Sequence, residues 1–157
     1  MGAHDCPSCV GCSSRRDFLR EAVGAAAGLT LLLGFVRGEA HGDAALRYPI
    51  PAADGAVIDR DHEIIIMRHK GRAYAFALSC PHKRTMLKWR GDDGRFQCPK
   101  HKSRYRPDGS FISGRATRGM DRHAIRLKGR ELIVDPTVVY RDDQNPARWK
   151  AAFVTLR

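Results

Sequence analysis

Two short segments, each pairing a cysteine with a histidine, constrain this chain more than any other feature of its sequence. Cys80 and His82 form a C-x-H pair, and 15 residues separate it from Cys98 and His101, a C-x-x-H pair. A proline follows each cysteine, and proline stiffens a loop because its ring fixes φ. Each pair directly follows a stretch that we expect to be a strand. Two stiff loops at strand ends would place four metal-ligating side chains around one small volume.

The chain from residue 57 onward has the pattern of a small antiparallel β domain. Runs rich in β-forming residues flank short turn sequences, of which Lys70-Gly71 is a hairpin signal. Short strands at close spacing predict an all-β fold. The expected strands are residues 62–69, 72–79, 86–90, 95–98, 123–127 and 131–135. A short helix is expected near residues 146–152.

Two metal chemistries fit the two pairs. Two cysteines and two histidines suit one tetrahedral structural zinc ion. One cysteine and one histidine per loop also suit a two-iron cluster, with both thiolates on one iron and both imidazoles on the other. Ser103 and Tyr105 favour the cluster, because hydrogen bonds to sulfur stabilise its reduced, more negative state. A closed zinc site needs neither hydroxyl, so a structural zinc-binding module stays as the alternative of another class.

With Ser103 and Tyr105 at these offsets, the pattern resembles the Rieske [2Fe–2S] family over about residues 62–135. The resemblance implies an all-β fold of Rieske type: an antiparallel β sandwich within residues 41–157, with a small cluster-binding subdomain at about 79–116. It also implies that six residues serve the cluster: Cys80, His82, Cys98, His101, Ser103 and Tyr105. The cysteines would hold the inner iron, and the histidines the outer iron through Nδ1. The serine would donate toward a bridging sulfide and the tyrosine toward a cysteine sulfur.

The chain departs from many quinol-oxidising members of this family at the loops themselves. Those relatives carry one further cysteine in each loop and join the two by a disulfide. Here Lys100 occupies that position in the second loop, and residues 83–86 of the first contain no cysteine. In "SGRAT", Arg115 stands where a proline is usual, and Lys83 stands where a leucine is common. These differences predict loops without a cross-link and a cationic tip.

The N-terminal 40 residues have the composition of an export signal. "SRRDFL" at 14–19 precedes an apolar run at 22–36 of only 15 residues, whereas a spanning helix needs about 20. The paired arginines resemble a twin-arginine signal, which implies folding before export. We expect residues 1–40 to be a cleaved signal or a membrane anchor through 17–37. The protein is then expected to be periplasmic or to lie at the periplasmic face of the cytoplasmic membrane. Cys6, Cys9 and Cys12 lie in this segment, and we interpret them as incidental.

The net charge of +11 lies entirely in residues 41–157, because the leader holds equal numbers of acidic and basic residues. The positive electrostatic potential of this charge favours an acidic or anionic partner. No helix-turn-helix, zinc-finger or stacking-aromatic pattern accompanies the charge, so we expect no nucleic-acid partner.

The resemblance implies one-electron transfer in a respiratory or periplasmic redox chain, as a subunit of an oxidoreductase rather than a catalyst alone. Electrons would pass from quinol or a partner oxidoreductase to a c-type cytochrome, as in the iron–sulfur subunit of a quinol–cytochrome c reductase. The alternative is the small Rieske subunit of an exported molybdenum oxidase such as arsenite oxidase. In either role we expect a redox partner with an acidic docking face.

Overall fold

The computed structural model describes residues 45–156, which lie within one compact unit, residues 41–157. The predicted signal at 1–40, its apolar run and its three cysteines lie outside the described residues. Across residues 45–156, no helix has the length and apolar character that crossing a membrane would require.

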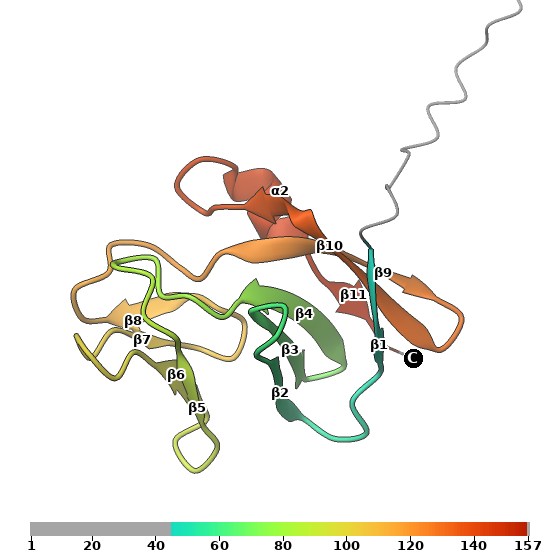
Figure 1. Cartoon of the computed structure of the whole chain (residues 1–157), viewed down its shortest axis with the longest axis horizontal. Helices are drawn as coiled ribbons and strands as arrows, with labels where there is room; N and C mark the ends of the chain where they lie inside the picture. Colours follow the sequence, from blue (N-terminus) through green and yellow to red (C-terminus); the bar gives the residue numbers. More distant parts are fainter. Residues whose placement is uncertain (1–44, 157) are drawn as a thin grey trace, which may run out of the picture. The chain divides into compact units, whose positions relative to one another are not determined.

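The described chain forms two antiparallel sheets (Figure 1). The larger sheet has the strand order β1-β10-β9-β4-β3-β2, and β11 pairs with β4. The smaller sheet has the order β5-β6-β7-β8. The strands of the larger sheet are β1 (Leu46–Pro49), β2 (Gly55–Asp59), β3 (Ile64–His69), β4 (Arg72–Ala77), β9 (Arg122–Lys128), β10 (Glu131–Tyr140) and β11 (Val154–Thr155). Those of the smaller sheet are β5 (Lys88–Arg90), β6 (Arg95–Gln97), β7 (Arg104–Tyr105) and β8 (Phe111–Ser113).

The smaller sheet is an insertion between two strands that are neighbours in the larger one. The chain leaves after β4, builds β5 to β8, and returns in β9, which pairs with β4 at Phe76 and Arg122. The all-β antiparallel fold expected from the sequence is confirmed. The hairpin at Lys70 and Gly71 is also confirmed: both have positive φ, 49° and 70°, as a tight primed turn requires. The expected helix is α2 (Pro146–Ala151).

The apolar run in β3 is continuous because this strand is buried on both faces. Ile64 and Ile66 belong to one core cluster, with Leu132 and Val134. Alternate residues of the same strand point to the other cluster. That second cluster also contains Phe96, Tyr105 and both cysteines of the two pairs. The sequence pairs are therefore attached to the main hydrophobic core and not to a separate surface loop.

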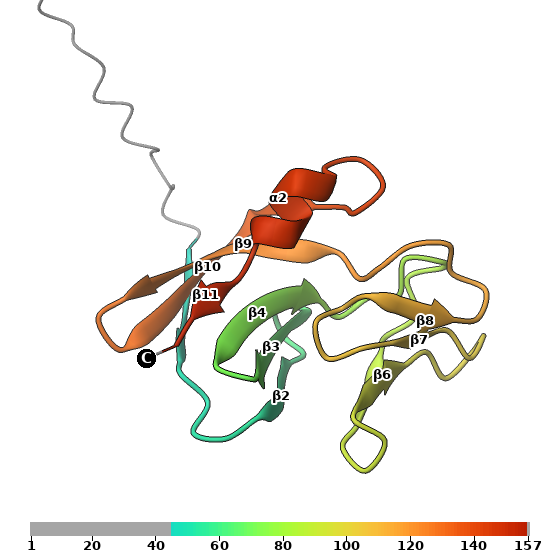
Figure 2. The ribbon, with the colours of Figure 1, turned by 180° about the vertical axis from the view of Figure 1, so that it is seen from behind.

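Arg122, at the start of β9, joins three parts of the fold. It is 3% exposed, and its guanidinium donates to the carbonyl oxygens of Trp149 (2.5 Å) and Asp108 (2.6 Å). The guanidinium also lies 3.7 Å from the Trp149 ring centroid. Burial lowers the pKa of Arg122 to about 10, which still leaves it charged at neutral pH. Because Asp108 follows β7 and Trp149 lies on α2, Arg122 connects the larger sheet, the insertion and the C-terminal helix. Figure 2 shows these three parts of the fold from behind.

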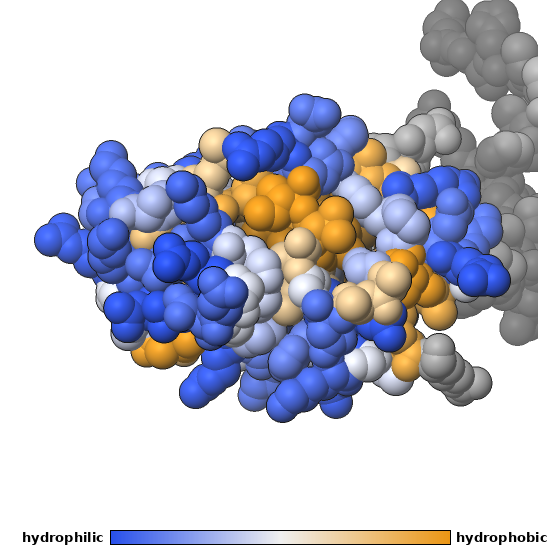
Figure 3. Space-filling view, turned by 90° about the horizontal axis from the view of Figure 1, so that it is seen from below, coloured by the Kyte–Doolittle hydropathy of each residue, from blue (hydrophilic) through white to orange (hydrophobic). Residues whose placement is uncertain are grey.

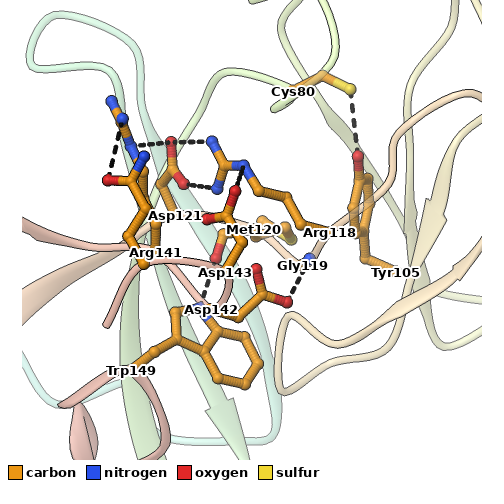
Figure 4. A network of polar contacts seen from close by, with 11 residues as sticks. Cys80, Tyr105, Arg118, Gly119, Met120, Asp121, Arg141, Asp142, Asp143 and Trp149 are labelled. Atoms are coloured by element: carbon orange, nitrogen blue, oxygen red, sulfur yellow. Dashed lines mark hydrogen bonds and ion pairs between the residues drawn. The ribbon is translucent and has the colours of Figure 1, made fainter. Parts of the chain in front are cut away.

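A polar network fixes the segment that returns from β8 to β9 (Figure 4). Arg118 forms an ion pair with Asp121, and the Gly119 amide donates to Asp142 at 2.7 Å. The Trp149 indole N–H donates to the carbonyl oxygen of Met120 at 2.8 Å. These contacts hold the C-terminal segment against the return strand.

One edge of the larger sheet is partly apolar. β2 pairs only with β3, and Val57 on β2 is 52% exposed. Figure 3 shows an apolar patch on one face of the molecule, bordered by hydrophilic residues. β2 contains no cysteine or histidine, so this edge is not part of the candidate metal site.

Candidate metal centre

The first cysteine–histidine pair lies in a tight loop, residues 80–85, that follows β4. The Cys80 amide donates to the Thr85 carbonyl oxygen at 2.8 Å, and the Arg84 amide donates to the Cys80 carbonyl oxygen at 2.8 Å. Arg84 has φ 49°, a left-handed conformation unusual for a residue with a side chain. Hydrogen bonds therefore fix both the amide and the carbonyl oxygen of Cys80.

The second loop, residues 98–103, repeats this arrangement. The Cys98 amide donates to the Ser103 carbonyl oxygen at 2.8 Å, and the Lys102 amide donates to the Cys98 carbonyl oxygen at 3.1 Å. Lys102 has φ 60°, matching the left-handed residue of the first loop. The two loops that carry the cysteine–histidine pairs thus share one hydrogen-bond pattern. This agrees with the stiff loops expected from Pro81 and Pro99.

The two histidines bring their Nδ1 atoms together. Nδ1 of His82 lies 3.2 Å from Nδ1 of His101, and the two rings are inclined at 81°. Two metal–nitrogen bonds of about 2.1 Å whose nitrogens are this far apart meet at roughly 100°. The spacing is therefore that of two ligands on one metal ion. A hydrogen bond between the two rings accounts for the same distance in the absence of a metal.

The two cysteines lie inside and the two histidines lie toward the surface. Cys80 and Cys98 are 1% and 0% exposed, and both are free thiols. His82 and His101 are partly exposed. A cluster held here would have its cysteine side in the core and its histidine side near solvent.

No three of the described cysteine, histidine or carboxylate side chains converge as a set that could hold one metal ion. A structural zinc ion takes four ligands around one point. A two-iron cluster asks for two protein ligands on each iron, and bridging sulfides complete the coordination. The four residues fit that requirement as two pairs.

Tyr105 contacts the sulfur of Cys80 (Figure 4). Its hydroxyl lies 3.2 Å from Sγ, and the tyrosine is 0% exposed. Burial raises the pKa of the Tyr105 phenol, and the hydrogen bond with Cys80 adds to the rise. The phenol therefore stays protonated and can donate to a metal-bound thiolate.

Ser103 is also fully buried beside the second loop. Its Oγ accepts a hydrogen bond from the Ala116 amide at 3.0 Å, and its side chain also interacts with the Tyr105 phenol. Gly114 makes this approach possible, since its φ is 109° and a Cβ there would lie 2.4 Å from Ser103 Cα. The "SGRAT" segment thus covers the second loop through a glycine and a backbone amide. The sequence predicted Ser103 but gave no signal for Ala116.

Basic side chains surround the histidines. Lys100, Arg115 and Lys83 act on His101, whose pKa is lowered by loss of solvation first and then by His82 and these cations. Five exposed basic residues, none of which forms an ion pair with another described residue, make up what we call the cationic tip: Lys83, Arg84, Lys100, Lys102 and Arg115.

All six residues expected from the sequence therefore lie together around the two loops. Residues 52–124 match the family model described as the Rieske [2Fe-2S] domain. These residues are a Rieske domain. Its cofactor is a Rieske-type [2Fe–2S] cluster. Proteins that carry this domain can therefore be compared with this chain in sequence and structure.

Curated proteins similar to this chain include iron–sulfur subunits of cytochrome b6-f complexes. The chain is 31% identical over 78 residues to subunit 1 from Synechocystis, covering 48% of this chain and 44% of the relative. It is 23% identical over 86 residues to the subunit from Chlorobaculum tepidum, covering 54% and 48%. The chain thus spans about half the length of the curated relatives it matches.

Solved Rieske structures also match. The cyanobacterial plasma membrane Rieske protein from Synechocystis has a TM-score of 0.43 and 21% identity, covering 50% of this chain and 82% of that chain.

Proposed function

We propose that Cys80 and Cys98 bind one iron of the cluster and that His82 and His101 bind the other through Nδ1. The observation that carries this assignment is the 3.2 Å separation of the two Nδ1 atoms above two fully buried thiols. When bound, the cluster supplies reversible one-electron transfer.

The surrounding residues then have separate tasks. Tyr105 donates to the Cys80 thiolate, and the buried Ser103 hydroxyl would donate toward a bridging sulfide. Both donations favour the more negative, reduced state and so raise the reduction potential. Phe96 and the rest of the core exclude water from the cysteine side. The histidines leave their outer ring edges at the surface, where a redox partner can approach.

The whole protein, in this proposal, is a one-electron carrier between quinol, or a partner oxidoreductase, and a c-type cytochrome. It serves as an electron-transfer subunit of the quinol–cytochrome c reductase type and does not catalyse a reaction alone. The names of its relatives support this role, since they are iron–sulfur subunits of cytochrome complexes. The cationic tip supports a partner with an acidic docking face. The sequence of residues 1–40 supports export by the twin-arginine route to the periplasm.

A second candidate role is the small subunit of an exported molybdenum oxidase. Two observations favour it: both described cysteines are free, so no disulfide joins the two loops, and the tip is charged where a quinol site would favour apolar side chains. The cofactor is the same in both roles, and only the electron donor differs.

The cofactor assignment is tested by iron and acid-labile sulfide content together with the EPR spectrum of the reduced protein. Two irons, two sulfides and a spectrum of the Rieske type are expected. Colourless protein containing zinc and no sulfide would overturn the assignment.

The electron donor is tested in the native membrane fraction. Quinol is added with and without an inhibitor of quinol oxidation, and reduction of the cluster is followed by EPR. Inhibitor-sensitive reduction is expected for the reductase role. A cluster that stays oxidised with quinol, but is reduced by a soluble donor, would favour the molybdenum-oxidase role.

A further inference from the structure

A basic cleft lies between the larger sheet and the insertion, away from the two metal-binding loops. It has a volume of about 430 Å³. The β3–β4 hairpin forms one wall, and the loop after β7 forms the other. The lining residues are His69, Lys70, Arg72, Tyr74, Arg106, Pro107 and Asp108. The metal centre uses none of these residues.

The charge of the cleft is strongly positive. Lys70, Arg72 and Arg106 form no ion pair with another described residue. Asp108 is the single carboxylate of the lining, and its Oδ1 already accepts a hydrogen bond from the Ser110 amide at 3.0 Å. Asp54, outside the lining, accepts a hydrogen bond from the Lys70 amide at 2.9 Å and lies 3.9 Å from Nδ1 of His69. Lys70, Arg72 and Arg106 still outnumber these two carboxylates, so the cleft attracts an anion.

Tyr74 contributes a hydroxyl to the lining of the cleft. The residue is 4% exposed, and its hydroxyl forms no hydrogen bond with another described residue. The ring packs against Phe76 at 5.7 Å and Phe153 at 5.9 Å, and the Arg122 guanidinium lies 5.0 Å from its centroid. With its ring enclosed, Tyr74 lines the cleft through its hydroxyl edge. The hydroxyl is therefore available to donate to a ligand oxygen that enters the cleft.

The two arginines are held in place by their surroundings. The Arg72 guanidinium lies 4.6 Å from the Phe153 ring centroid, and stacking on a ring leaves the in-plane N–H groups free. The Arg106 backbone is fixed in a turn: its carbonyl oxygen accepts from Gly109 and its amide donates to Ser110, both at 2.9 Å. The two guanidinium groups therefore belong to opposite walls of one cleft.

We propose that this cleft binds a phosphate group. A carboxylate is satisfied by one arginine, whereas a phosphate presents several acceptor oxygens and more charge, which matches two arginines, a lysine and a hydroxyl. The group belongs either to free inorganic phosphate or to the headgroup of an anionic phospholipid. Because Arg72 is on the larger sheet and Arg106 is in the insertion, the bound anion joins these two parts. This inference does not rest on the identity of the redox partner.

The first arm of the test measures binding of inorganic phosphate to the full chain with its cluster. Isothermal titration at constant ionic strength, with chloride as the balancing ion, should show saturable binding at one site. Arg72→Gln and Arg106→Gln should each weaken binding about tenfold, since each removes a charge-assisted hydrogen bond. Tyr74→Phe keeps the ring packing and should weaken binding several-fold. Arg126→Gln removes the same charge from an exposed position on β9 and should change nothing.

The second arm distinguishes the two sources of the phosphate group. Co-sedimentation with phosphatidylglycerol vesicles, and with phosphatidylcholine vesicles as control, is compared for the same variants. Binding to anionic vesicles that is lost in Arg106→Gln, without saturable binding of free phosphate, assigns the group to a lipid. Binding of phosphate alone assigns it to the free ion.

Several results would overturn the inference. One is the absence of saturable binding in both arms, and another is equal weakening by Arg126→Gln and by the cleft variants. The Tm and cluster absorbance of each variant show that it is folded. If an arginine variant does not fold, phosphate-induced NMR shifts in the wild type decide: the Arg106 and Arg72 amides should move, and shifts confined elsewhere contradict the proposal.

Discussion

The hydroxyl of Tyr105 lies 3.2 Å from the sulfur of Cys80, and both side chains are buried in the same core cluster. Water cannot replace the phenol here, because the tyrosine is 0% exposed. A hydrogen bond to a metal-bound thiolate strengthens when the centre gains an electron and its negative charge increases. The contact therefore acts on the reduction potential as well as on packing.

Tyr105→Phe should lower the reduction potential while the cluster stays bound. If the hydrogen bond is about 1 kcal/mol stronger in the reduced state, its loss lowers the potential by about 40 mV. A redox titration followed by EPR measures the shift. Tyr140→Phe removes a phenol on β10 and serves as the control. An unchanged midpoint with an intact cluster would show that the Tyr105 hydroxyl does not act on the sulfur.

Gly114→Ala should disturb the metal centre through the backbone. The new Cβ would lie 2.4 Å from Ser103 Cα, and φ 109° disfavours any side chain. The covering segment must then move, and Ser103 loses the amide of Ala116. We expect a lower cluster content and an altered EPR spectrum, measured together with iron content. Gly129→Ala is the matched control, because φ is 62° there and no atom lies within 4 Å of the added Cβ. Equal cluster loss in both variants would mean that backbone strain alone is responsible.

The metal loops and hairpins could be predicted from the sequence because their signals are local. Cys80 and His82 are two residues apart, and Lys70-Gly71 alone encodes a tight turn. The continuous apolar run of β3 likewise follows from burial on both faces. In each case the residues that form the feature are also neighbours in the chain.

Contacts between distant residues gave no such signal. Nothing in the sequence distinguishes Arg122 from the other arginines, but it is 3% exposed and donates to the carbonyl oxygens of Asp108 and Trp149. Strands β1 and β11 are short and carry little pattern, and only their pairing with β10 and β4 defines them. The basic cleft likewise depends on two segments, residues 69–74 and 106–108, that are distant in the chain.

His101→Cys should lower the reduction potential strongly. A thiolate ligand adds negative charge to the iron and stabilises the oxidised state; all-cysteine clusters lie near −400 mV, whereas Rieske centres lie at roughly −150 to +300 mV. The expected fall is on the order of 100 mV or more, measured by EPR-monitored titration. His69→Cys, outside the two loops, is the control. An intact cluster with an unchanged potential would show that His101 is not a ligand.

Acid should destabilise the fold through Asp59. This carboxylate accepts a hydrogen bond from Tyr48 at 2.8 Å and from the backbone amides of Asp61 and His62. The Tyr48 hydrogen bond, with those of His62, lowers the pKa of Asp59 from 3.8 to about 2. Because the folded-state pKa is depressed, the stabilisation is complete above about pH 4 and is lost as pH falls toward 2.

Asp59→Asn should therefore reduce the acid dependence of unfolding between pH 4 and 2 by about 1–2 kcal/mol. Urea unfolding followed by circular dichroism at a series of pH values measures it. Asp61→Asn is the control, since Asp61 is exposed and only its amide takes part in this network. If the Asp59→Asn protein shows the same loss of stability in acid as the wild type, the network does not carry the effect.

Charge reversal at the cationic tip should slow electron transfer to an acidic c-type cytochrome. Lys83→Glu with Lys100→Glu replaces attraction by repulsion beside His82 and His101, and the association rate should fall about fivefold or more at low salt. At about 0.1 M salt the Debye length is near 10 Å, so the difference from wild type should shrink as salt is added. Stopped-flow kinetics at several ionic strengths measures the rate.

Arg126→Glu with Lys128→Glu is the control. It makes the same change in net charge on the β9–β10 hairpin, at the end of the molecule opposite the smaller sheet (Figure 1). Equal slowing by the two double variants would show that the partner responds to overall charge, whereas slowing only at the tip places the docking site around the histidines.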